Sequence, residues 1–244
     1  MLRRGVALAE RGPHDMRPIV WEETARGRAD IYVRPAAMPL TRRHQRIIRA
    51  CDILLSAGGL IVLAPVMFVI GLLVRLTAPG PVFFAQRRVG AGGRIFDCYK
   101  FRTMRVDAEA RLQELLAASP AAREEWESSH KLRNDPRIVG MGRFLRQSSL
   151  DELPQLWNVL RGDMSLVGPR PIVMAEVPRY GRYFAEYCSV RPGITGLWQI
   201  SARNNCSYRR RVAYDVRYSR GVSLYLYLRI LVMTVPGVLL VRGT

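Results

Sequence analysis

Basic residues dominate the charge of this 244-residue chain: 38 Lys and Arg stand against 20 Asp and Glu, for a formal charge of +18. A chain of this length can form one domain with a core of its own, and its charge predicts an anionic partner, whether phospholipid headgroups, phosphorylated substrates or nucleic acid. The cysteines and histidines lie too far apart in sequence for a short-spaced zinc site. We predict reduced, unpaired thiols at all four cysteines: Cys51, Cys98, Cys188 and Cys206.

Residues 1–40 contain many Arg with scattered Gly and Pro, and they hold few apolar runs. Such a segment cannot bury enough apolar surface to fold alone, so we predict a basic, flexible leader. Nothing in it has the pattern of a cleaved signal peptide.

Residues 53–74 form an uncharged apolar stretch of roughly 22 residues, about enough for one helix to cross a hydrocarbon core. Pro65 removes a backbone donor in the middle of this stretch, which predicts a bend. Arginines flank both ends: Arg42, Arg43, Arg46 and Arg49 precede the stretch, and Arg75, Arg87 and Arg88 follow it. Because basic flanks stay in the cytoplasm, we predict a re-entrant membrane helix within residues 41–78 that enters and leaves by the same face. An ordinary transmembrane anchor is the alternative, and a buried helix of a soluble core is the third.

A β-hairpin is predicted next. Its strands, Val82–Arg88 and Arg94–Phe101, flank a turn that is rich in glycine, at Gly90, Gly92 and Gly93. No strand-loop-helix context with a phosphate-binding spacing surrounds these glycines, so we assign them turn geometry alone. Residues 107–130 have few breakers and predict one surface helix.

Two further helical regions follow. A helix is predicted over Glu152–Arg161, with Gly162 just past its end. The segment Tyr214–Val241 alternates aromatic, aliphatic and basic residues. This pattern fits helices lying in a membrane interface and equally fits a packed terminal helix.

The start of the helix at Glu152 concentrates polar residues: Arg146, Ser148, Ser149, Asp151 and Glu152. Backbone amides and the positive dipole end at a helix start attract anions, so this is a candidate phosphate site. The competing interpretation is a capping box of Ser149 and Glu152, which spacing alone favours. Pro154 counts against that box, because a helix capped by Ser149 would place the proline beyond its first turn.

Two later segments place an arginine beside Pro and Gly. Arg170 lies between two prolines, which fix the backbone around a guanidinium group suited to bidentate phosphate binding. In Arg191–Gly196 the backbone is able to approach a ligand closely. Taken alone, each segment is most often an ordinary turn.

Three blocks together are specific for one family: Lys100–Met104, Ser149–Pro171 and Arg191–Gln199. With them the chain resembles the bacterial sugar transferases, small monotopic phosphoglycosyl transferases that include exopolysaccharide-initiating undecaprenyl-phosphate galactose and glucose phosphotransferases. The resemblance runs from residue 41 to the C-terminus. The Ser-Pro pair of relatives is Ala64-Pro65 here, which removes a hydroxyl able to bond a freed backbone carbonyl.

The resemblance implies transfer of a hexose-1-phosphate from a UDP-sugar to undecaprenyl (polyprenyl) phosphate, with release of UMP, as the first membrane step of exopolysaccharide or other surface glycan synthesis. Asp151 is then the nucleophile, forms a covalent aspartyl-phosphosugar and contacts Mg²⁺. Glu152 assists it as base or metal partner. The expected phosphate-binding residues are Lys100, Arg146, Arg170 and Arg191.

The expected fold is α+β: a monotopic protein embedded in the bacterial inner membrane by one re-entrant, Pro-broken helix, with a β-hairpin and amphipathic helices around a small catalytic core. Residues 1–40, 41–78 and 79–244 are then a leader, a membrane helix and a catalytic domain on the cytoplasmic face. Expected partners are a UDP-sugar, polyprenyl phosphate and phospholipid, with a homodimer left open. A scaffold or nucleic-acid binder is the rival class, but no recognition motif supports it, so no nucleic acid is expected.

Overall fold

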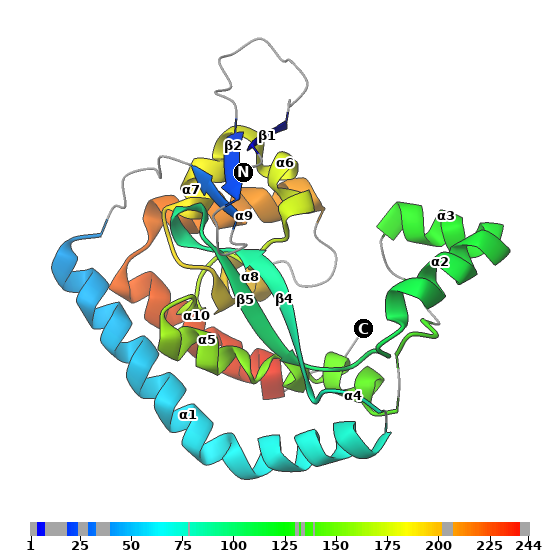
Figure 1. The fold of residues 1–244 in the computed structure, drawn as a ribbon. Coiled ribbons are helices and arrows are strands. Elements are labelled where there is room, and N and C mark those ends of the chain that lie inside the picture. Colours follow the sequence, from blue (N-terminus) through cyan, green and yellow to red (C-terminus); the bar gives the residue numbers. More distant parts are fainter. Residues whose placement is uncertain are drawn as a thin grey trace. The chain divides into compact units, whose positions relative to one another are not determined.

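The computed structural model describes residues 40–77, 79–129, 132, 135–138, 140–201 and 207–239, without the side chains of 127–129 and 235–239, and the backbone of three strands before residue 40. Helices and short strands mix along the chain (Figure 1), which confirms the α+β class. The chain divides into two compact units. Unit 1 comprises Met1–Val62, Ala85–Tyr99 and Gln155–Leu240, and unit 2 comprises Leu63–Phe84, Lys100–Pro154 and Val241–Thr244. The predicted division at residues 41 and 79 concerns membrane and function, and it stays a prediction.

Residues 1–40, for which the sequence predicts a basic, flexible leader, contain a three-stranded antiparallel sheet. Its strands are β1 (Arg4–Ala7), β2 (Ile19–Glu23) and β3 (Ala29–Tyr32), in the order β1-β2-β3. The prediction was based on the few apolar side chains available for burial. The hydrogen bonds between strands, by contrast, are formed by backbone N–H and C=O groups and need no particular side chains. The flexibility of the leader stays a prediction.

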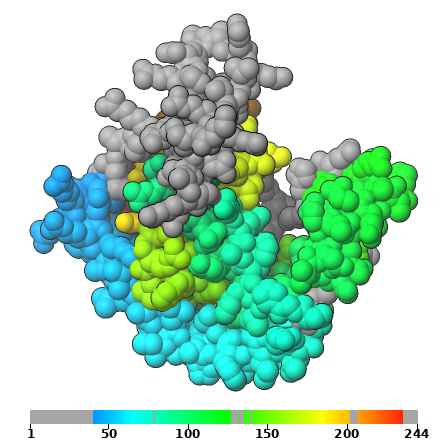
Figure 2. All heavy atoms as spheres, in the orientation of Figure 1, coloured from blue at the N-terminus to red at the C-terminus, as the bar shows by residue number. Residues whose placement is uncertain are grey.

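Helix α1 covers Arg42–Thr77, so it is longer at both ends than the predicted apolar stretch and holds Pro65 inside it. By length and composition it is the one helix among the described residues that is able to cross a membrane, and 11% of its most apolar window is buried. Leu54, Ile61 and Phe68 are each more than 70% exposed, and Figure 2 shows the α1 side chains, blue to cyan, at the molecular surface. An exposed apolar surface of this size marks a site of interaction, and the length of α1 matches the hydrocarbon core of a lipid bilayer. Whether α1 is re-entrant stays a prediction.

Two charged side chains tie the first turns of α1 to the core of unit 1. Arg49 donates to the carbonyls of Val159 and Leu160 at 2.6 and 2.8 Å. Asp52, which is fully buried, accepts three hydrogen bonds on one carboxylate oxygen. They come from the Ser165 hydroxyl at 3.0 Å, the Leu166 amide at 2.9 Å and the Tyr227 hydroxyl at 2.8 Å.

The predicted hairpin is confirmed. Strands β4 (Phe83–Val89) and β5 (Ile95–Phe101) form a two-stranded sheet. The short 3₁₀ helix η1 (Ala91–Gly93) joins them. Gly92 and Gly93 have φ of 67° and 78°, a left-handed backbone that glycine adopts without steric cost. The glycines therefore serve turn geometry, as expected.

The single surface helix predicted over 107–130 is wrong. Two helices occupy this stretch, α2 (Ala108–Ala118) and α3 (Pro120–Ser129). Ser119 between them is extended, and its hydroxyl accepts a hydrogen bond from the Ala122 amide at 3.2 Å. Pro120 starts α3, where its missing N–H has no partner to lose. The Ser-Pro pair thus ends one helix and caps the next.

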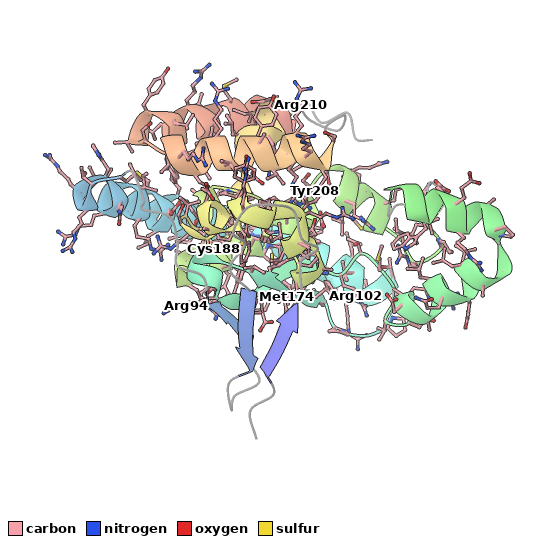
Figure 3. All side chains as sticks on the ribbon, turned by 90° about the horizontal axis from the view of Figure 1, so that it is seen from above. Arg94, Arg102, Met174, Cys188, Tyr208 and Arg210 are labelled. Atoms are coloured by element: carbon pink, nitrogen blue, oxygen red, sulfur yellow. The ribbon has the colours of Figure 1, made fainter. Side chains whose placement is uncertain are left out.

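The remaining elements of unit 1 are mostly short: α5 (Gln155–Arg161), β6 (Ser165–Val167), η3 (Met174–Glu176), α6 (Val177–Tyr180), η4 (Gly181–Tyr183), α7 (Phe184–Cys188), β7 (Gly193–Thr195), α8 (Leu197–Ser201), α9 (Tyr208–Gly221) and α10 (Leu224–Leu239). Tyr180 and Tyr187 fill one apolar cluster under α9, and Tyr227 with Ile230 of α10 fills another. In Figure 3, Tyr208 at the start of α9 faces the α6 and α7 region, whereas Arg210 points away from it.

The C-terminal helix α10 is packed on the core on one side and exposes apolar side chains on the other, so it has features of both alternatives that the sequence left open. Tyr227 and Ile230 are fully buried, so α10 is packed on the core. Tyr225 and Val232 on its outer face are 72% and 68% exposed. A packed helix with an exposed apolar face is what an interfacial position requires, and that position stays a prediction.

Cys51, Cys98 and Cys188 are not joined in disulfides, as predicted. Burial raises the pKa of the Cys188 thiol to about 12, so it stays protonated and behaves as a small apolar group. Cys206 lies outside the described residues.

Candidate active site

The polar cluster before α5 is built on an unusual turn in unit 2. Helix α4 (Gly142–Gln147) is followed by Ser149, whose φ of 58° is left-handed, and then by the 3₁₀ helix η2 (Leu150–Glu152). Ser149 is the one non-glycine residue with positive φ among the described residues. Such backbone costs roughly 1 kcal/mol or more and is often found at functional sites.

The capping box and the helix start predicted at Glu152 are both wrong. The Ser149 side chain makes no capping hydrogen bond. The amides of Glu152 and Leu153 instead bond carbonyls three residues back, at 3.1 and 3.3 Å, which tightens the turn into η2. Pro154 has no N–H to continue this ladder, so the α-helix begins after it, at Gln155.

The turn brings three of the predicted site residues together. The Lys100 ammonium lies 2.6 Å from Glu152 Oε1 and 3.9 Å from Asp151 Oδ2. All three side chains are largely buried, with 22%, 10% and 19% of the surface of Lys100, Asp151 and Glu152 exposed. Two adjacent carboxylates thus share one ammonium group, which is hydrogen-bonded to Glu152 and a more distant ion-pair neighbour of Asp151.

An apolar cluster of unit 2 holds both elements of this site in place. Phe101, next to Lys100 in β5, is buried in the same cluster as Leu145 of α4. Leu150 and Leu153, on either side of the acidic pair, pack against that cluster. Because apolar residues packed in this cluster are direct sequence neighbours of Lys100 and of the acidic pair, their packing fixes the positions of the charged side chains.

Arg146 lies in the last turn of α4 and is exposed. It acts electrostatically on Asp135, which is held by Arg137 through bonds of 2.7 and 2.8 Å. Burial pushes the pKa of Asp135 upward, but the hydrogen bonds from Arg137 outweigh burial and hold the pKa below its ordinary value. The sequence analysis missed this bidentate pair, although an Asp and an Arg two residues apart beside a proline were a readable signal.

Arg170 belongs to unit 1, where it lies near Arg88 and Asp215. Arg88 donates to the carbonyl of Pro171 at 2.9 Å and shares Glu176 with Arg211, at 3.8 and 3.6 Å. Burial lowers the pKa of the Arg88 guanidinium group. The loop that carries Arg170 is therefore anchored by a buried basic network.

The glycines beside Arg170 and Arg191 bring two backbone segments into close contact. Strands β6 and β7 pair in parallel, and the Gly168 amide donates to Thr195 at 2.8 Å. A Cβ on Gly168 would collide with the Arg191 carbonyl, and one on Gly193 would collide with the Gly168 amide. The predicted close approach of the backbone is thus explained by two loops packed backbone to backbone.

Arg191 has a structural contact in unit 1. Its guanidinium group donates to the carbonyl of Gly162 at 3.0 Å, just past the end of α5. Arg49 donates to the carbonyls of Val159 and Leu160 in the last turn of that helix, so two cations lie at its negative dipole end. Burial lowers the pKa of Arg191. A phosphate-binding role for Arg191 stays a prediction.

Asn158 is a positioning residue that the sequence analysis did not identify. It is fully buried in α5, donates to the Asp97 carbonyl at 2.7 Å and accepts from the Tyr99 amide at 3.0 Å. These bonds fix β5 up to the residue before Lys100. The signal was an Asn on the helix side that faces inward, among Leu and Val.

A magnesium ion fits the acidic pair only together with a substrate. Within the described part of the chain, no three His, Cys, Asp or Glu side chains gather in a way that would hold a metal ion. Mg²⁺ is usually bound by one or two carboxylates plus substrate phosphates and water, however. Asp151 and Glu152 are of the right type and are adjacent, and they would supply the protein's share of such a site.

Comparison with known proteins shows similarity over most of the chain. Residues 43–241 match the family described as bacterial sugar transferase. The exopolysaccharide production protein ExoY of Sinorhizobium fredii is 46% identical over 196 residues, which cover 80% of this chain and 87% of that protein. The undecaprenyl-phosphate galactose phosphotransferase of Salmonella typhimurium is 48% identical over 202 residues, covering 82% and 42%. The UDP-glucose:undecaprenyl-phosphate glucose-1-phosphate transferase of Xanthomonas campestris is 40% identical over 198 residues, covering 77% and 38%. The chain belongs to the bacterial sugar transferase family, as its three blocks predict.

Proposed function

We propose that this enzyme transfers a hexose-1-phosphate from a UDP-sugar to undecaprenyl phosphate, through a covalent intermediate on Asp151, at the start of exopolysaccharide or other surface glycan synthesis. The observation that carries the proposal is the Asp151–Glu152 pair with Lys100 against it. The names of the Salmonella and Xanthomonas relatives support the substrates, since both act on undecaprenyl phosphate and the second uses UDP-glucose.

In the first step, an Asp151 carboxylate oxygen attacks the phosphorus that carries the sugar. A new oxygen–phosphorus bond forms, and the bond from that phosphorus to the bridging oxygen of the diphosphate breaks. UMP leaves with the bridging oxygen and its electron pair. The sugar phosphate remains on Asp151 as an acyl phosphate.

In the second step, a phosphate oxygen of undecaprenyl phosphate attacks the same phosphorus. The acyl–phosphate bond breaks, Asp151 regains its carboxylate, and the lipid carries a sugar diphosphate. Dividing the transfer in this way allows a water-soluble donor and a lipid acceptor to use one carboxylate in turn, which gives ping-pong kinetics.

Positive groups are essential because the nucleophile and both substrates are anions. Lys100 is positioned to neutralise phosphate oxygens next to Asp151, and its bond to Glu152 keeps the ammonium group there. Arg146 of the same unit is a further candidate for phosphate binding, and the same role for Arg170 stays a prediction. Asp151 and Glu152 would hold Mg²⁺, and the ion would supply additional charge neutralisation.

The site belongs at a membrane, which is where the acceptor is found. The exposed apolar surface of α1 supports membrane association. We place the protein in the bacterial inner membrane with the acidic pair on the cytoplasmic side, because arginines flank both ends of the apolar stretch. UDP-sugars are then available to the site from the cytosol.

The test uses the purified chain in detergent with UDP-galactose or UDP-glucose, undecaprenyl phosphate and magnesium. Asp151→Asn should lower UMP release by at least roughly 10³-fold, because it removes the nucleophile. Asp107→Asn, an exposed acid of unit 2, should leave the rate unchanged. With donor alone, intact-mass spectrometry should show a sugar-phosphate adduct on the wild type and none on Asp151→Asn. Full turnover by Asp151→Asn would refute the proposal.

A further inference from the structure

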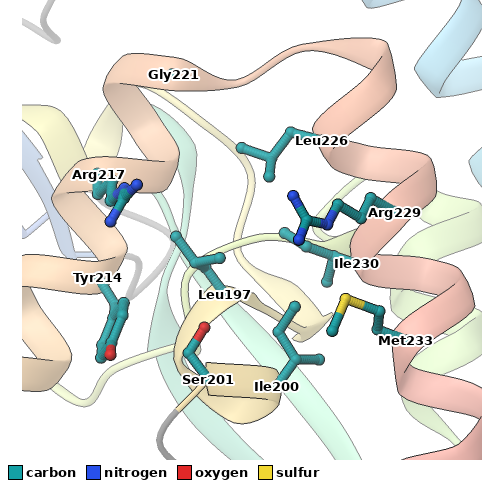
Figure 4. Close-up of a pocket in the computed structure, with 10 residues that line it drawn as sticks. All are labelled: Leu197, Ile200, Ser201, Tyr214, Arg217, Gly221, Leu226, Arg229, Ile230 and Met233. Atoms are coloured by element: carbon teal, nitrogen blue, oxygen red, sulfur yellow. The ribbon is translucent and has the colours of Figure 1, made fainter.

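Unit 1 has a pocket of about 380 Å³ between α8, α9 and α10, within the size range of small-ligand sites (Figure 4). Apolar side chains form most of its lining: Leu197, Ile200, Leu226, Ile230 and Met233. Ser201, Tyr214 and Gly221 complete the neutral part of the lining. None of these residues takes part in the proposed sugar transfer.

Two guanidinium groups flank this apolar lining. Arg217 comes from α9 and Arg229 from α10, on opposite sides of the pocket (Figure 4). Both side chains are exposed, and no lining residue that the structure describes is acidic. Within the described ranges neither arginine forms an ion pair, whereas Arg220 of the same helix α9 is paired with Glu186. Uncompensated positive charge beside apolar surface is complementary to an anionic amphiphile.

The outer face of α10 continues the apolar surface beyond the pocket. Tyr225, Val232 and Met233 are 72%, 68% and 45% exposed, while Ile230 of the pocket lining is fully buried. Met233 belongs both to the lining and to this outer face. A chain that leaves the pocket would therefore remain in contact with apolar side chains, as an acyl chain at a bilayer surface requires.

We propose that the pocket binds one anionic glycerophospholipid of the membrane. The phosphodiester lies between Arg217 and Arg229, and the first part of an acyl chain lies against Leu197, Leu226 and Ile230. Two exposed cations in an open pocket give modest affinity, which suits a ligand that the bilayer supplies in bulk rather than a scarce one. Binding fixes α9 and α10 at the level of the headgroups, and it does not depend on the sugar-transfer chemistry.

The test is fluorescence anisotropy on the full chain in neutral detergent, titrated with phosphatidylglycerol that carries a fluorescent acyl chain. The double variant Arg217→Gln/Arg229→Gln should raise the Kd about 25-fold, because each basic residue at a lipid surface contributes roughly a factor of five. Arg209→Gln should leave the Kd within about twofold of wild type, because this exposed arginine of α9 does not line the pocket and so does not contact the bound lipid. Equal affinity of wild type and double variant would overturn the proposal.

Further arms separate the headgroup from the chain and from other ligands. Ser201→Trp, which fills the pocket without changing charge, should weaken binding of the same lipid. Phosphatidylcholine with the same acyl chains should bind more weakly than phosphatidylglycerol, and glycerol phosphate should not compete. Competition by glycerol phosphate, equal binding of phosphatidylcholine, or tighter binding of undecaprenyl phosphate through the same two arginines would each refute a phospholipid site. Thermal unfolding of every variant checks that it is folded.

Discussion

Lys100 lies at unequal distances from its two carboxylate neighbours, 2.6 Å from Glu152 and 3.9 Å from Asp151. If the lysine neutralises phosphate charge, Lys100→Met should lower kcat/KM by roughly 10²- to 10³-fold, as loss of one charge-stabilising donor does elsewhere, and Lys100→Arg should recover part of it. Glu152→Gln keeps an oxygen that accepts from the ammonium group, so it should lose less activity than Glu152→Leu. Rates of UMP release measure all four variants. Equal losses in Gln and Leu would show that Glu152 does not act by holding the lysine.

Asp215 is a buried acid whose titration should be visible in stability. Burial raises the pKa of Asp215 from 3.8 to about 7, against the hydrogen bond from Tyr180 at 2.7 Å and the nearby charges of Arg211 and Arg170, which lower it. Because the folded state holds this proton more tightly than the unfolded chain, its contribution to stability is complete below pH 3.8 and is lost as the pH rises through about 7. The loss is on the order of 4 kcal/mol.

Asp215→Asn has no carboxyl group to titrate at this position. Between about pH 4 and about pH 8, which roughly spans the unfolded and folded pKa values of Asp215, its free energy of unfolding should therefore fall less than that of the wild type. Thermal unfolding in one detergent across this range measures the difference between the two proteins, in which the other acids cancel. Parallel curves would show that Asp215 does not carry the effect.

At the scale of single elements, α1 gives a prediction about topology. The arginines at both ends of its apolar part predict that both ends face the cytoplasm. Cysteines introduced as Arg42→Cys and Thr77→Cys, in a Cys51→Ser background, should both resist a membrane-impermeant maleimide added outside spheroplasts. Both should react after the membrane is opened. Labelling of one end alone from outside would favour the transmembrane anchor.

Helix α5 and strand β5 are joined through one side chain. Asn158→Ala leaves the Asp97 carbonyl and the Tyr99 amide without their partner, so it should lower the free energy of unfolding by about 3 kcal/mol. Trp157→Phe, at the half-exposed neighbouring position, should change it little. Thermal unfolding in detergent compares the two variants, and similar losses would contradict the assignment.

The elements show which part of the fold could be predicted from sequence. Periodicity and glycines predicted the hairpin to within about one residue, since a tight turn leaves few alternatives. The predicted start of α5 was wrong because a left-handed Ser149 and a 3₁₀ turn precede the helix. These features depend on the packing of Leu150 and Leu153, which no local sequence pattern shows. The break at Ser119 was a readable signal that was outweighed by a run of helix-forming residues.

The candidate site shows the same difference between features that local sequence predicts and features that depend on contacts between distant residues. The adjacent acids Asp151 and Glu152 could be identified from one block, but their pairing with Lys100 joins residues about fifty positions apart and rests on the resemblance alone until the fold is known. For Arg191–Gly196 the sequence left open a close approach to a ligand or an ordinary turn, and the parallel pairing of β6 with β7, which brings Gly168 against Gly193, could not be predicted. Spacing reports which side chains are adjacent, and only tertiary packing decides what they face.

Over the whole molecule, charge and apolar exposure point to the same kind of surrounding. A formal charge of +18 favours anionic headgroups, and the exposed apolar side chains of α1 and α10 favour the adjoining hydrocarbon. Neither property alone distinguishes a membrane from other polyanions or from a protein partner. Together they describe the boundary between water and lipid, where a polyprenyl phosphate presents its headgroup.

The bonds made by Arg49 and Asp52 bear on attempts to obtain a water-soluble version of this enzyme. Trimming away the apolar segment from its N-terminal side would also remove the partners of two α5 carbonyls, the Ser165 and Tyr227 hydroxyls and the Leu166 amide. The truncated protein would lose buried hydrogen bonds together with the exposed apolar surface of α1, and it should fail to fold. Solubility has to be sought by replacing outward-facing residues of α1 with polar ones while its first turns are left intact.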